Sequence, residues 1–178
     1  MKRMAYLENG ALALAVVVSG IMAGFFYTYS FNVNLAMLEV DGATYARVQS
    51  LFNLNVRHTM FFVFFFGGGA APLVALAANW RRRRTAAFWL IAGAGALYVL
   101  GVILFTSAVN LPLNAYTESW DPAALPADWA ATRAAWNRAN AVRVGVAFVS
   151  FCLHVAALAA RASAGRDAAP GRMAAVLH

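Results

Sequence analysis

Four long stretches of this chain contain no Asp, Glu, Lys or Arg, and they constrain the fold more than any other feature. They cover residues 9–38, 59–80, 85–117 and 144–160. A bilayer core of about 30 Å needs about 20 apolar residues in a helix, and each stretch reaches or nearly reaches that length. We therefore predict four transmembrane helices, at about residues 10–31, 58–79, 86–108 and 141–161.

The fold class follows from the hydrogen bonding of the backbone. Amides that face hydrocarbon have no water to bond, so a spanning segment is a helix or part of a closed barrel, and the alternating pattern of barrel strands is absent here. Composition agrees, because 62% of the residues are hydrophobic and only 12% are charged. We predict an all-α, four-transmembrane-helix bundle that forms one domain over residues 1–161. A polar, disordered tail is expected at 162–178, and it includes His178.

Basic residues gather at three places in the sequence. These are Lys2 and Arg3, the run Arg81 to Arg84, and Arg161, Arg166 and Arg172. Because successive spanning helices alternate in direction, all three places fall on one side, which the positive-inside rule makes cytoplasmic. The excess of 14 Lys and Arg over 7 Asp and Glu therefore reports topology, and we expect no nucleic-acid partner. We expect an integral protein of a bacterial inner membrane with both termini cytoplasmic and outer loops at 32–57 and 110–140.

The two halves of the chain share a plan: an outward helix, an exit rich in Asn, an amphipathic stretch and a returning helix. Asn32 and Asn34 follow the first helix much as Asn110 and Asn114 follow the third. We interpret the halves as pseudo-repeated hairpins with a short amphipathic helix in each outer loop. Convergence at helix ends is the alternative explanation.

Small residues recur at the spacing used in close helix packing. They are Gly20 and Gly24, Gly67 and Ala71, and less clearly Gly93 and Leu97. We expect close helix contacts at these positions and a kink or loosening of the second helix at Pro72. The aromatic cluster at 25–31 is interpreted as a set of interfacial anchors.

The second outer loop carries a stripe of large polar and aromatic side chains. Asp128 is suited to cap a helix, after which Trp129, Arg133, Trp136, Asn140 and Arg143 recur at spacings of three and four. The first outer loop offers a counterpart in Tyr45, Gln49, Phe52, Asn53, Asn55 and Arg57. Together these residues predict a pocket that opens outward near the level of the lipid headgroups.

The pattern W-x-x-x-N-x-x-R at Trp136, Asn140 and Arg143, with Thr106, Pro112 and Asn114, resembles the anthrone oxygenase-like family of small four-helix integral membrane proteins. The resemblance runs from about residue 20 to about residue 159. It implies oxidation of an anthrone to an anthraquinone with molecular oxygen. Most bacterial members of that family have no assigned substrate.

Such chemistry needs donors that stabilise an enolate oxygen, and a base. The candidate catalytic residues are Asn114, Arg133, Asn140 and Arg143 as donors, and His58 as base. The candidate substrate-binding residues are Asn34, Asn55, Thr106, Asn110, Trp136 and Asn137. Each also has a structural interpretation, in which Arg143 snorkels to phosphates, Asn140 bridges helices and His58 is a solvated helix-end residue.

No cofactor and no metal is expected, with haem or a quinone left open. His58 and His154 differ in depth by roughly 16 Å at about 1.5 Å per residue, so they do not form a pair of axial ligands. Cys152 and His154 point to different faces of one helix. As an ionisable group in a membrane helix, His154 stays a minor candidate for contact with a proton or ligand.

We therefore predict a membrane oxidoreductase that oxidises a lipophilic aromatic or polyketide-type substrate with molecular oxygen at an outward-facing polar pocket. The expected partners are the lipid bilayer, a lipophilic small molecule and, as an open possibility, further copies of the chain. Two alternatives remain, a small-molecule binding or transport protein and an accessory subunit of a membrane complex.

Overall fold

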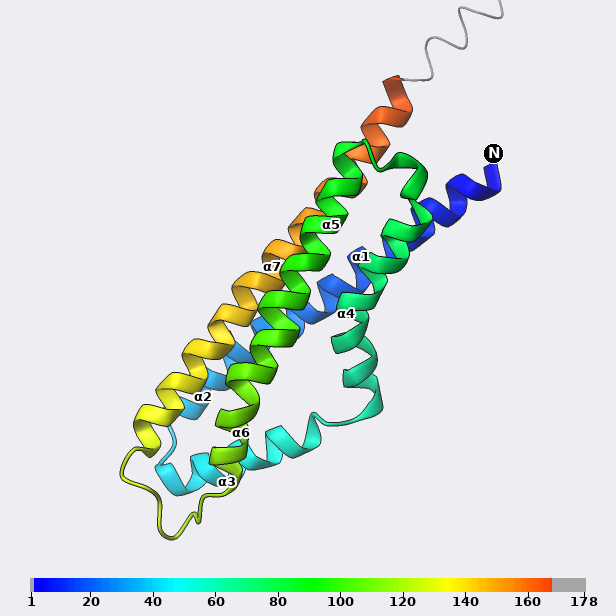
Figure 1. Ribbon diagram of the computed structural model, residues 1–178. Coiled ribbons are helices and arrows are strands. Elements are labelled where there is room, and N and C mark those ends of the chain that lie inside the picture. The colour runs from blue at the N-terminus through cyan, green and yellow to red at the C-terminus, as the bar shows by residue number, and fades with distance from the viewer. Residues whose placement is uncertain (1, 168–178) are drawn as a thin grey trace, which may run out of the picture.

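The computed structural model describes residues 2–167 of the chain, which form an all-helical bundle (Figure 1). The α-helices are α1 (Lys2–Thr28), α2 (Asn34–Leu38), α3 (Gly42–Asn55), α4 (Thr59–Ala78), α5 (Ala86–Tyr98), α6 (Leu111–Glu118) and α7 (Trp129–Asp167). Four helical runs are long and apolar enough to cross a membrane, namely Arg3–Leu38, Thr59–Ala78, Ala86–Glu118 and Trp129–Ala164. The predicted all-α bundle with four spanning helices is confirmed.

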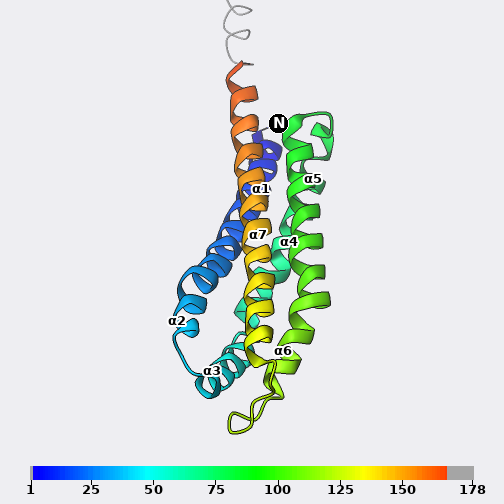
Figure 2. The ribbon, with the colours of Figure 1, turned by 90° about the vertical axis from the view of Figure 1, so that its left-hand side faces the viewer.

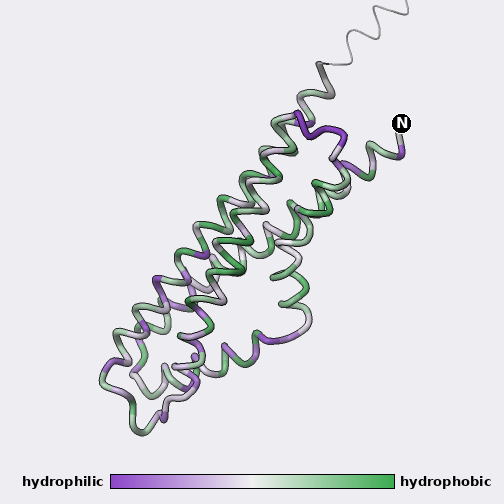
Figure 3. Tube along the Cα trace, viewed as in Figure 1, coloured by the Kyte–Doolittle hydropathy of each residue, from purple (hydrophilic) through white to green (hydrophobic). Residues whose placement is uncertain are grey.

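The four long helices form a ring in which α1 packs on α4 and α7, and α5 packs on the same two helices (Figures 1 and 2). The short helices α2, α3 and α6 gather at one end of the bundle, which we call the α3 end. The turn with Arg81 to Arg84 lies at the opposite end, which we call the arginine end. Hydrophobic residues dominate the helices between the two ends (Figure 3).

Two of the spanning runs contain π-helical turns. One covers Tyr29–Val33 between α1 and α2, and two more cover Val99–Leu104 and Thr106–Asn110 between α5 and α6. A π-helical turn fits an extra residue into the helix and re-aims the side chains around it, and such turns are common at functional sites. The turns in both halves lie toward the α3 end, where the candidate site is found.

Three of the four helical runs extend further than the predicted spans, and this corrects the picture of the second outer loop. In the region predicted as loop 110–140, α6 continues the α5 run and α7 begins at Trp129, so no separate amphipathic helix forms there. Only α3, in the first loop, is a separate helix. The reason is local: residues 129–142 are rich in Ala and contain no Gly or Pro, so nothing ends the helix before the membrane span.

The predicted start of the disordered tail at residue 162 is wrong, because α7 continues to Asp167. Residues 156–164 contain six Ala and no Gly or Pro, so nothing ends the helix at Arg161. The remainder of the predicted tail, with His178, lies outside the described residues.

The close packing of α4 and α5 depends on two glycines. A Cβ atom at Gly68 would lie 2.3 Å from a ring carbon of Tyr98, whose hydroxyl donates to the Phe65 carbonyl at 3.1 Å. A Cβ at Gly95 would lie 2.8 Å from the Pro72 side chain, and Pro72 sits inside α4 without ending it. The spacing of small residues in the sequence correctly selected α4 and α5 as closely packed helices, but it did not select Gly68 or Gly95.

Gly20 is one of the glycines whose spacing predicts a close helix contact, and a Cβ added there would lie 3.1 Å from the Phe151 ring. Gly24 and Gly93 have no such neighbour within 4 Å, so the contacts predicted there are wrong. Because large apolar side chains such as Val17, Leu73 and Phe148 are exposed in the middle of the spanning runs, the outer surface suits contact with lipid chains.

We predict that Gly68→Ala lowers the thermal unfolding midpoint of the purified protein in detergent. The added methyl group collides with Tyr98, and overpacking of this kind costs about 1–3 kcal/mol. Gly93→Ala is the control, because a Cβ there meets no atom within 4 Å. Equal midpoints for the two variants would contradict the tight α4–α5 contact.

Candidate functional site

A pocket with about 400 Å³ of empty space, counting its open mouth, lies at the α3 end. Its lining comprises Phe25, Phe26, Tyr29, Phe52, Asn53, Val56, Phe61, Asn114, Trp136, Asn140 and Arg143. These residues come from α1 and its π-helical turn, α3 and the turn after it, α4, α6 and α7. Aromatic walls with a few polar groups are typical of sites for small molecules.

Arg143 is the principal charged group of this pocket, and it is only 8% exposed. Its guanidinium donates to the Asn140 Oδ1 atom at 2.6 Å and to the Thr106 hydroxyl at 3.4 Å, while Nε has no acceptor. No described acidic residue forms an ion pair with it. A buried cation without a carboxylate is costly, and the observation suggests that the site accommodates an anionic or strongly polar oxygen.

The guanidinium of Arg143 also lies over aromatic rings. Its Cζ atom is 4.8 Å from the centroid of the Phe26 ring and 5.9 Å from that of Trp136. Such cation–π contacts contribute about 0.5–2 kcal/mol and stabilise the positive charge without neutralising it. The charge of Arg143 is therefore retained in the site.

Two amide side chains extend the polar wall. Asn140 donates to the Ser30 hydroxyl at 2.6 Å while its oxygen accepts from Arg143. Asn114 accepts from the Trp136 indole N–H at 2.7 Å, which holds the indole in the pocket and fixes the orientation of the amide. Among the described residues the Asn114 NH₂ group has no acceptor, so it is free to donate to a ligand.

A second chain of hydrogen bonds fixes the α3 side of the pocket. Gln49 donates to the oxygen of Asn53 at 3.0 Å, and Asn53 donates to the Thr117 hydroxyl at 3.3 Å. All three side chains are buried. These bonds hold α3 against α6, so the wall that α3 supplies is attached to the bundle.

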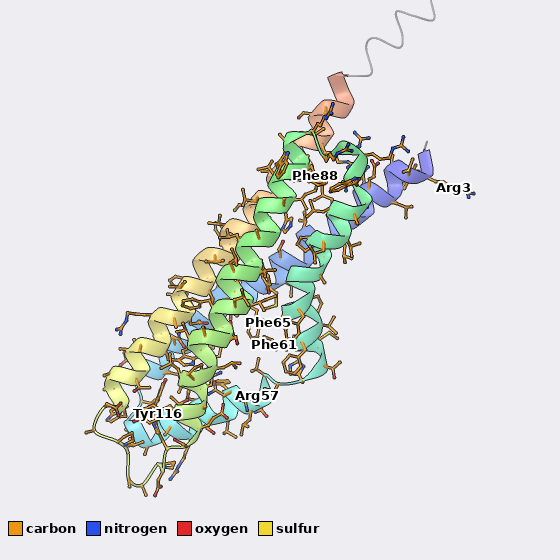
Figure 4. The ribbon with its side chains drawn as sticks, in the orientation of Figure 1. Arg3, Arg57, Phe61, Phe65, Phe88 and Tyr116 are labelled. Carbon is orange, nitrogen blue, oxygen red and sulfur yellow. The ribbon has the colours of Figure 1, made fainter. Side chains whose placement is uncertain are left out.

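The aromatic side chains form flat walls. The ring centroid of Tyr29 lies 5.2 Å from that of Trp136 and 5.6 Å from that of Phe52. The ring centroids of Phe25 on α1 and Phe61 on α4 lie 5.5 Å apart. Phe61 also stacks on Phe65 along α4, and Figure 4 labels both. Walls of this kind suit a planar aromatic ligand.

The structure brings together four of the predicted site residues, Asn114, Trp136, Asn140 and Arg143, and places Thr106 against Arg143. Arg133 lies elsewhere. It stacks over Trp129 at 4.8 Å and Tyr45 at 5.6 Å and donates to the Met37 carbonyl at 3.2 Å. Burial raises the pKa of Tyr45 to about 12, so a neutral phenol faces the cation. Arg133 thus joins α7 to the α2–α3 segment.

His58 is also outside the pocket. It is exposed, and its Nδ1 atom accepts the Phe61 backbone N–H at 3.3 Å, which caps α4. Asn34, Asn55 and Asn137 do not line the pocket either. Asn34 is buried at the start of α2, Asn55 is exposed at the end of α3, and Asn137 is half-buried on α7.

Asn110 is buried, and neither its oxygen nor its nitrogen has a hydrogen-bond partner. It lies one helical turn from Thr106 and one from Asn114, on the same helical run. An unpartnered buried amide lowers stability, so it is unusual in a region that serves packing alone.

Sequence reasoning missed Ser30 entirely and assigned Phe25, Phe26 and Tyr29 to anchoring in the interface. Tyr29 and Ser30 lie in the π-helical turn after α1, for which the sequence carries no clear signal, whereas Phe25 and Phe26 lie before it in α1. His154 is fully buried, has no partner on either ring nitrogen and lies outside the pocket. Within the described part of the chain, no three His, Cys, Asp or Glu side chains come together as metal ligands do.

We predict that Asn140→Ala lowers stability by about 1–3 kcal/mol, because a buried guanidinium loses its acceptor and Ser30 loses its donor. Asn137→Ala, three residues earlier on α7, is the matched control and should behave as wild type. Denaturant or thermal unfolding in detergent measures both. An equal loss of stability in the two variants would show that the hydrogen bonds of Asn140 do not stabilise the protein.

We also predict that Asn110→Leu stabilises the protein by about 1–3 kcal/mol, since it removes an unpaired amide at nearly constant volume. If the amide contacts a ligand, the same variant loses ligand affinity. Unfolding and binding measured side by side separate the two effects. A destabilised variant would mean that Asn110 has a partner that the structure does not show.

The comparison with known proteins identifies the family of the chain. A sequence profile described as anthrone oxygenase matches residues 52–153. No curated protein and no solved structure matches the chain. The matched region contains Asn114, Trp136, Asn140 and Arg143, and it covers more than half of the sequence. The chain therefore belongs to the anthrone oxygenase family.

Proposed function

We propose that this protein is a membrane oxidoreductase that oxidises a flat, lipophilic aromatic ketone of the anthrone type with molecular oxygen. The observation that carries the proposal is Arg143, a buried cation with no carboxylate partner among the described residues, in a pocket with aromatic walls. The membership of the chain in the anthrone oxygenase family supports the reaction type.

The chemistry of such a ketone explains why one cation is useful. The CH₂ group opposite the carbonyl loses a proton, and the resulting enolate carries its charge on oxygen. Donors arranged in advance around that oxygen stabilise it more than water does. In our proposal the Arg143 guanidinium and the Asn114 NH₂ group provide these donors, while Asn140 orients the guanidinium.

The enolate is electron-rich enough to react with oxygen directly. O₂ adds at the deprotonated carbon, the product takes up a proton to become a hydroperoxide, and loss of water leaves a second carbonyl. The net change is CH₂ + O₂ → C=O + H₂O, in which the substrate is oxidised and O₂ is its only oxidant. We therefore propose a reaction that needs no cofactor.

The pocket lining contains no carboxylate and no imidazole. In our proposal the bound ketone loses its proton without a base from the protein, because the nearby cation lowers the pKa of its CH₂ group. The proton leaves through the open mouth of the pocket. His58, which caps α4, has no part in this scheme.

We also propose how the enzyme is oriented in the membrane. The arginine end faces the cytoplasm of a bacterial cell, as the positive-inside rule requires, and the pocket lies near the opposite surface of the inner membrane. A lipophilic substrate dissolved in the bilayer then approaches a site at the depth of the headgroups.

We expect Arg143→Ala to lower oxygen uptake with an anthrone by about 100-fold to 1,000-fold, the scale seen when one oxyanion donor is removed. Arg143→Lys should retain part of the activity, because the charge remains while the forked geometry is lost. The matched control is Arg138→Ala, which changes an exposed arginine on the same helix. An oxygen electrode and the absorbance of the quinone report turnover in purified, detergent-solubilised protein.

Unchanged turnover in Arg143→Ala, with insertion and folding intact, would remove this pocket as the active site. A second candidate function follows from the lack of a carboxylate or imidazole in the lining: a protein that binds or transports weakly acidic aromatic molecules without turnover. Quenching of Trp136 fluorescence by the anthrone, lost in Arg143→Ala, with no oxygen uptake in the wild type would favour this alternative.

A further inference from the structure

The arginine end contains a second buried polar cluster, distinct from the pocket. Glu8 of α1 is only 5% exposed and accepts hydrogen bonds from Arg82 Nε at 2.9 Å and from Arg161. Arg161 also donates to the Asn79 side chain, whose nitrogen donates to the carbonyl oxygens of Glu8 at 3.2 Å and Ala75 at 2.8 Å. The cluster joins α1, the end of α4 and α7.

The charges of this cluster do not balance. One carboxylate, Glu8, pairs with two guanidinium groups, Arg82 and Arg161, so the cluster keeps a net positive charge. The side chain of Arg82 is 48% exposed and bonds Glu8 through Nε, which leaves both of its terminal NH₂ groups available. Arg81 lines an adjacent cavity together with Glu8 and Arg82, and it adds to the positive potential.

A groove runs along the bundle past these guanidinium groups. It encloses about 1050 Å³, counting its open side, between the first turns of α1 and the last turns of α7, which diverge in Figure 1. Its lining consists of Ala5, Asn9, Ala13, Arg82, Leu158, Arg161, Ala162 and Ala164. Small and apolar side chains thus form most of its walls. The two guanidinium groups lie within the groove, with Ala13 and Leu158 on the membrane side of them and Ala5, Ala162 and Ala164 on the other side.

The layout of the groove matches the layout of a phospholipid. Both guanidinium groups contact Glu8, and Ala13 lies five residues after Glu8 on α1, so it is about 7.5 Å deeper in the membrane span than the charged cluster. Leu158 precedes Arg161 on α7 and lies on the membrane side of it. A phosphate at the guanidinium groups would therefore place an acyl chain along apolar walls.

Exposed tryptophans indicate the depth of the charged end. Trp80 lies in the same 3₁₀ turn as Arg82, is 59% exposed and stacks with Arg83 at 5.6 Å from the ring centroid. Trp89, on the following helix, is also exposed. Indole rings of this kind prefer the level of the headgroups, so Arg82 lies where lipid phosphates lie.

We infer that this groove binds one anionic phospholipid. Its phosphate accepts charge-assisted hydrogen bonds from Arg82 and Arg161, and one acyl chain lies against Ala13 and Leu158. The net positive charge that remains after pairing with Glu8 selects a lipid with net negative charge over a zwitterionic one. The apolar part of the groove on the membrane side of the charges, with Ala13 and Leu158, selects a lipid over a free phosphate ion.

The test measures lipid binding rather than activity, so its result does not depend on the proposed oxygenase function. Detergent-purified protein is titrated with phosphatidylglycerol, phosphatidylcholine or inorganic phosphate, and bound lipid is counted by native mass spectrometry. We expect one phosphatidylglycerol molecule to remain bound to the wild type. Arg82→Gln should weaken that binding by about fivefold or more, on the scale of one basic side chain near an anionic surface.

Two further variants make the test specific. Arg84→Gln changes an exposed arginine of the same turn that does not line the groove, and it should bind the lipid as the wild type does. Ala13→Phe fills the groove at an exposed position and leaves every charge in place, so it should lose the lipid while the fold is retained.

Several outcomes would overturn the inference. Equal retention of phosphatidylcholine would remove the selection by charge, and equal weakening by Arg84→Gln would indicate a diffuse basic surface. Displacement of the lipid by millimolar inorganic phosphate would indicate an ion site without a role for the acyl chain. Full retention of the lipid by Ala13→Phe would show that the groove does not hold the chain.

Discussion

The α3 end of this bundle is organised around the burial of a single unpaired cation. Moving a guanidinium away from water costs several kcal/mol even after relaxation, and a carboxylate normally offsets that cost. Around Arg143 the offset comes instead from the oxygens of Asn140 and Thr106 and from the faces of Phe26 and Trp136. These neutral groups hold the guanidinium in place while its positive charge remains available to a ligand. Asn140 and Trp136 are in turn held by Ser30 and Asn114, so much of the site serves to position one charge.

The π-helical turns supply the hydroxyl groups that this arrangement needs. Ser30 lies in the turn Tyr29–Val33 and Thr106 in the turn Thr106–Asn110, and both accept hydrogen bonds from α7. A regular α-helix would give these residues a different orientation, because each π-helical turn changes the phase of the side chains that follow. The two outward-running helices thus depart from regular geometry on the sides where they meet the polar face of α7. We interpret the irregular turns as part of the construction of the site.

The fold and part of the site can be predicted from the sequence because residues on one helix are positioned by their spacing alone. Trp136, Asn140 and Arg143 lie on one uninterrupted helix, so their spacing alone places them on one face. Arg133 lies on the same stripe, but its turn of α7 is covered by the α2–α3 segment, and only the tertiary structure decides that contact. His58 was predicted as a base from its chemistry, yet its position before α4 makes it a helix cap. The sequence placed Asn53 in the first-loop counterpart of the pocket, but only the docking of α3 separates it from Asn55, which does not line the pocket. Ser30 depends on a π-helical turn that local spacing does not encode.

The two ends of the bundle together distinguish two uses of buried arginine. At the arginine end, Glu8 pairs with Arg82 and Arg161, and this carboxylate lets three helices meet at low electrostatic cost. An equivalent carboxylate beside Arg143 would stabilise the fold in the same way, but none is present among the described residues. An arginine that only snorkelled to lipid phosphates would be exposed at its tip, whereas Arg143 is buried and its Nε lacks an acceptor. This difference between the two ends is explained if the negative charge at the α3 end comes from the substrate. A carboxylate of the protein at that position would compete with an enolate for the Arg143 guanidinium.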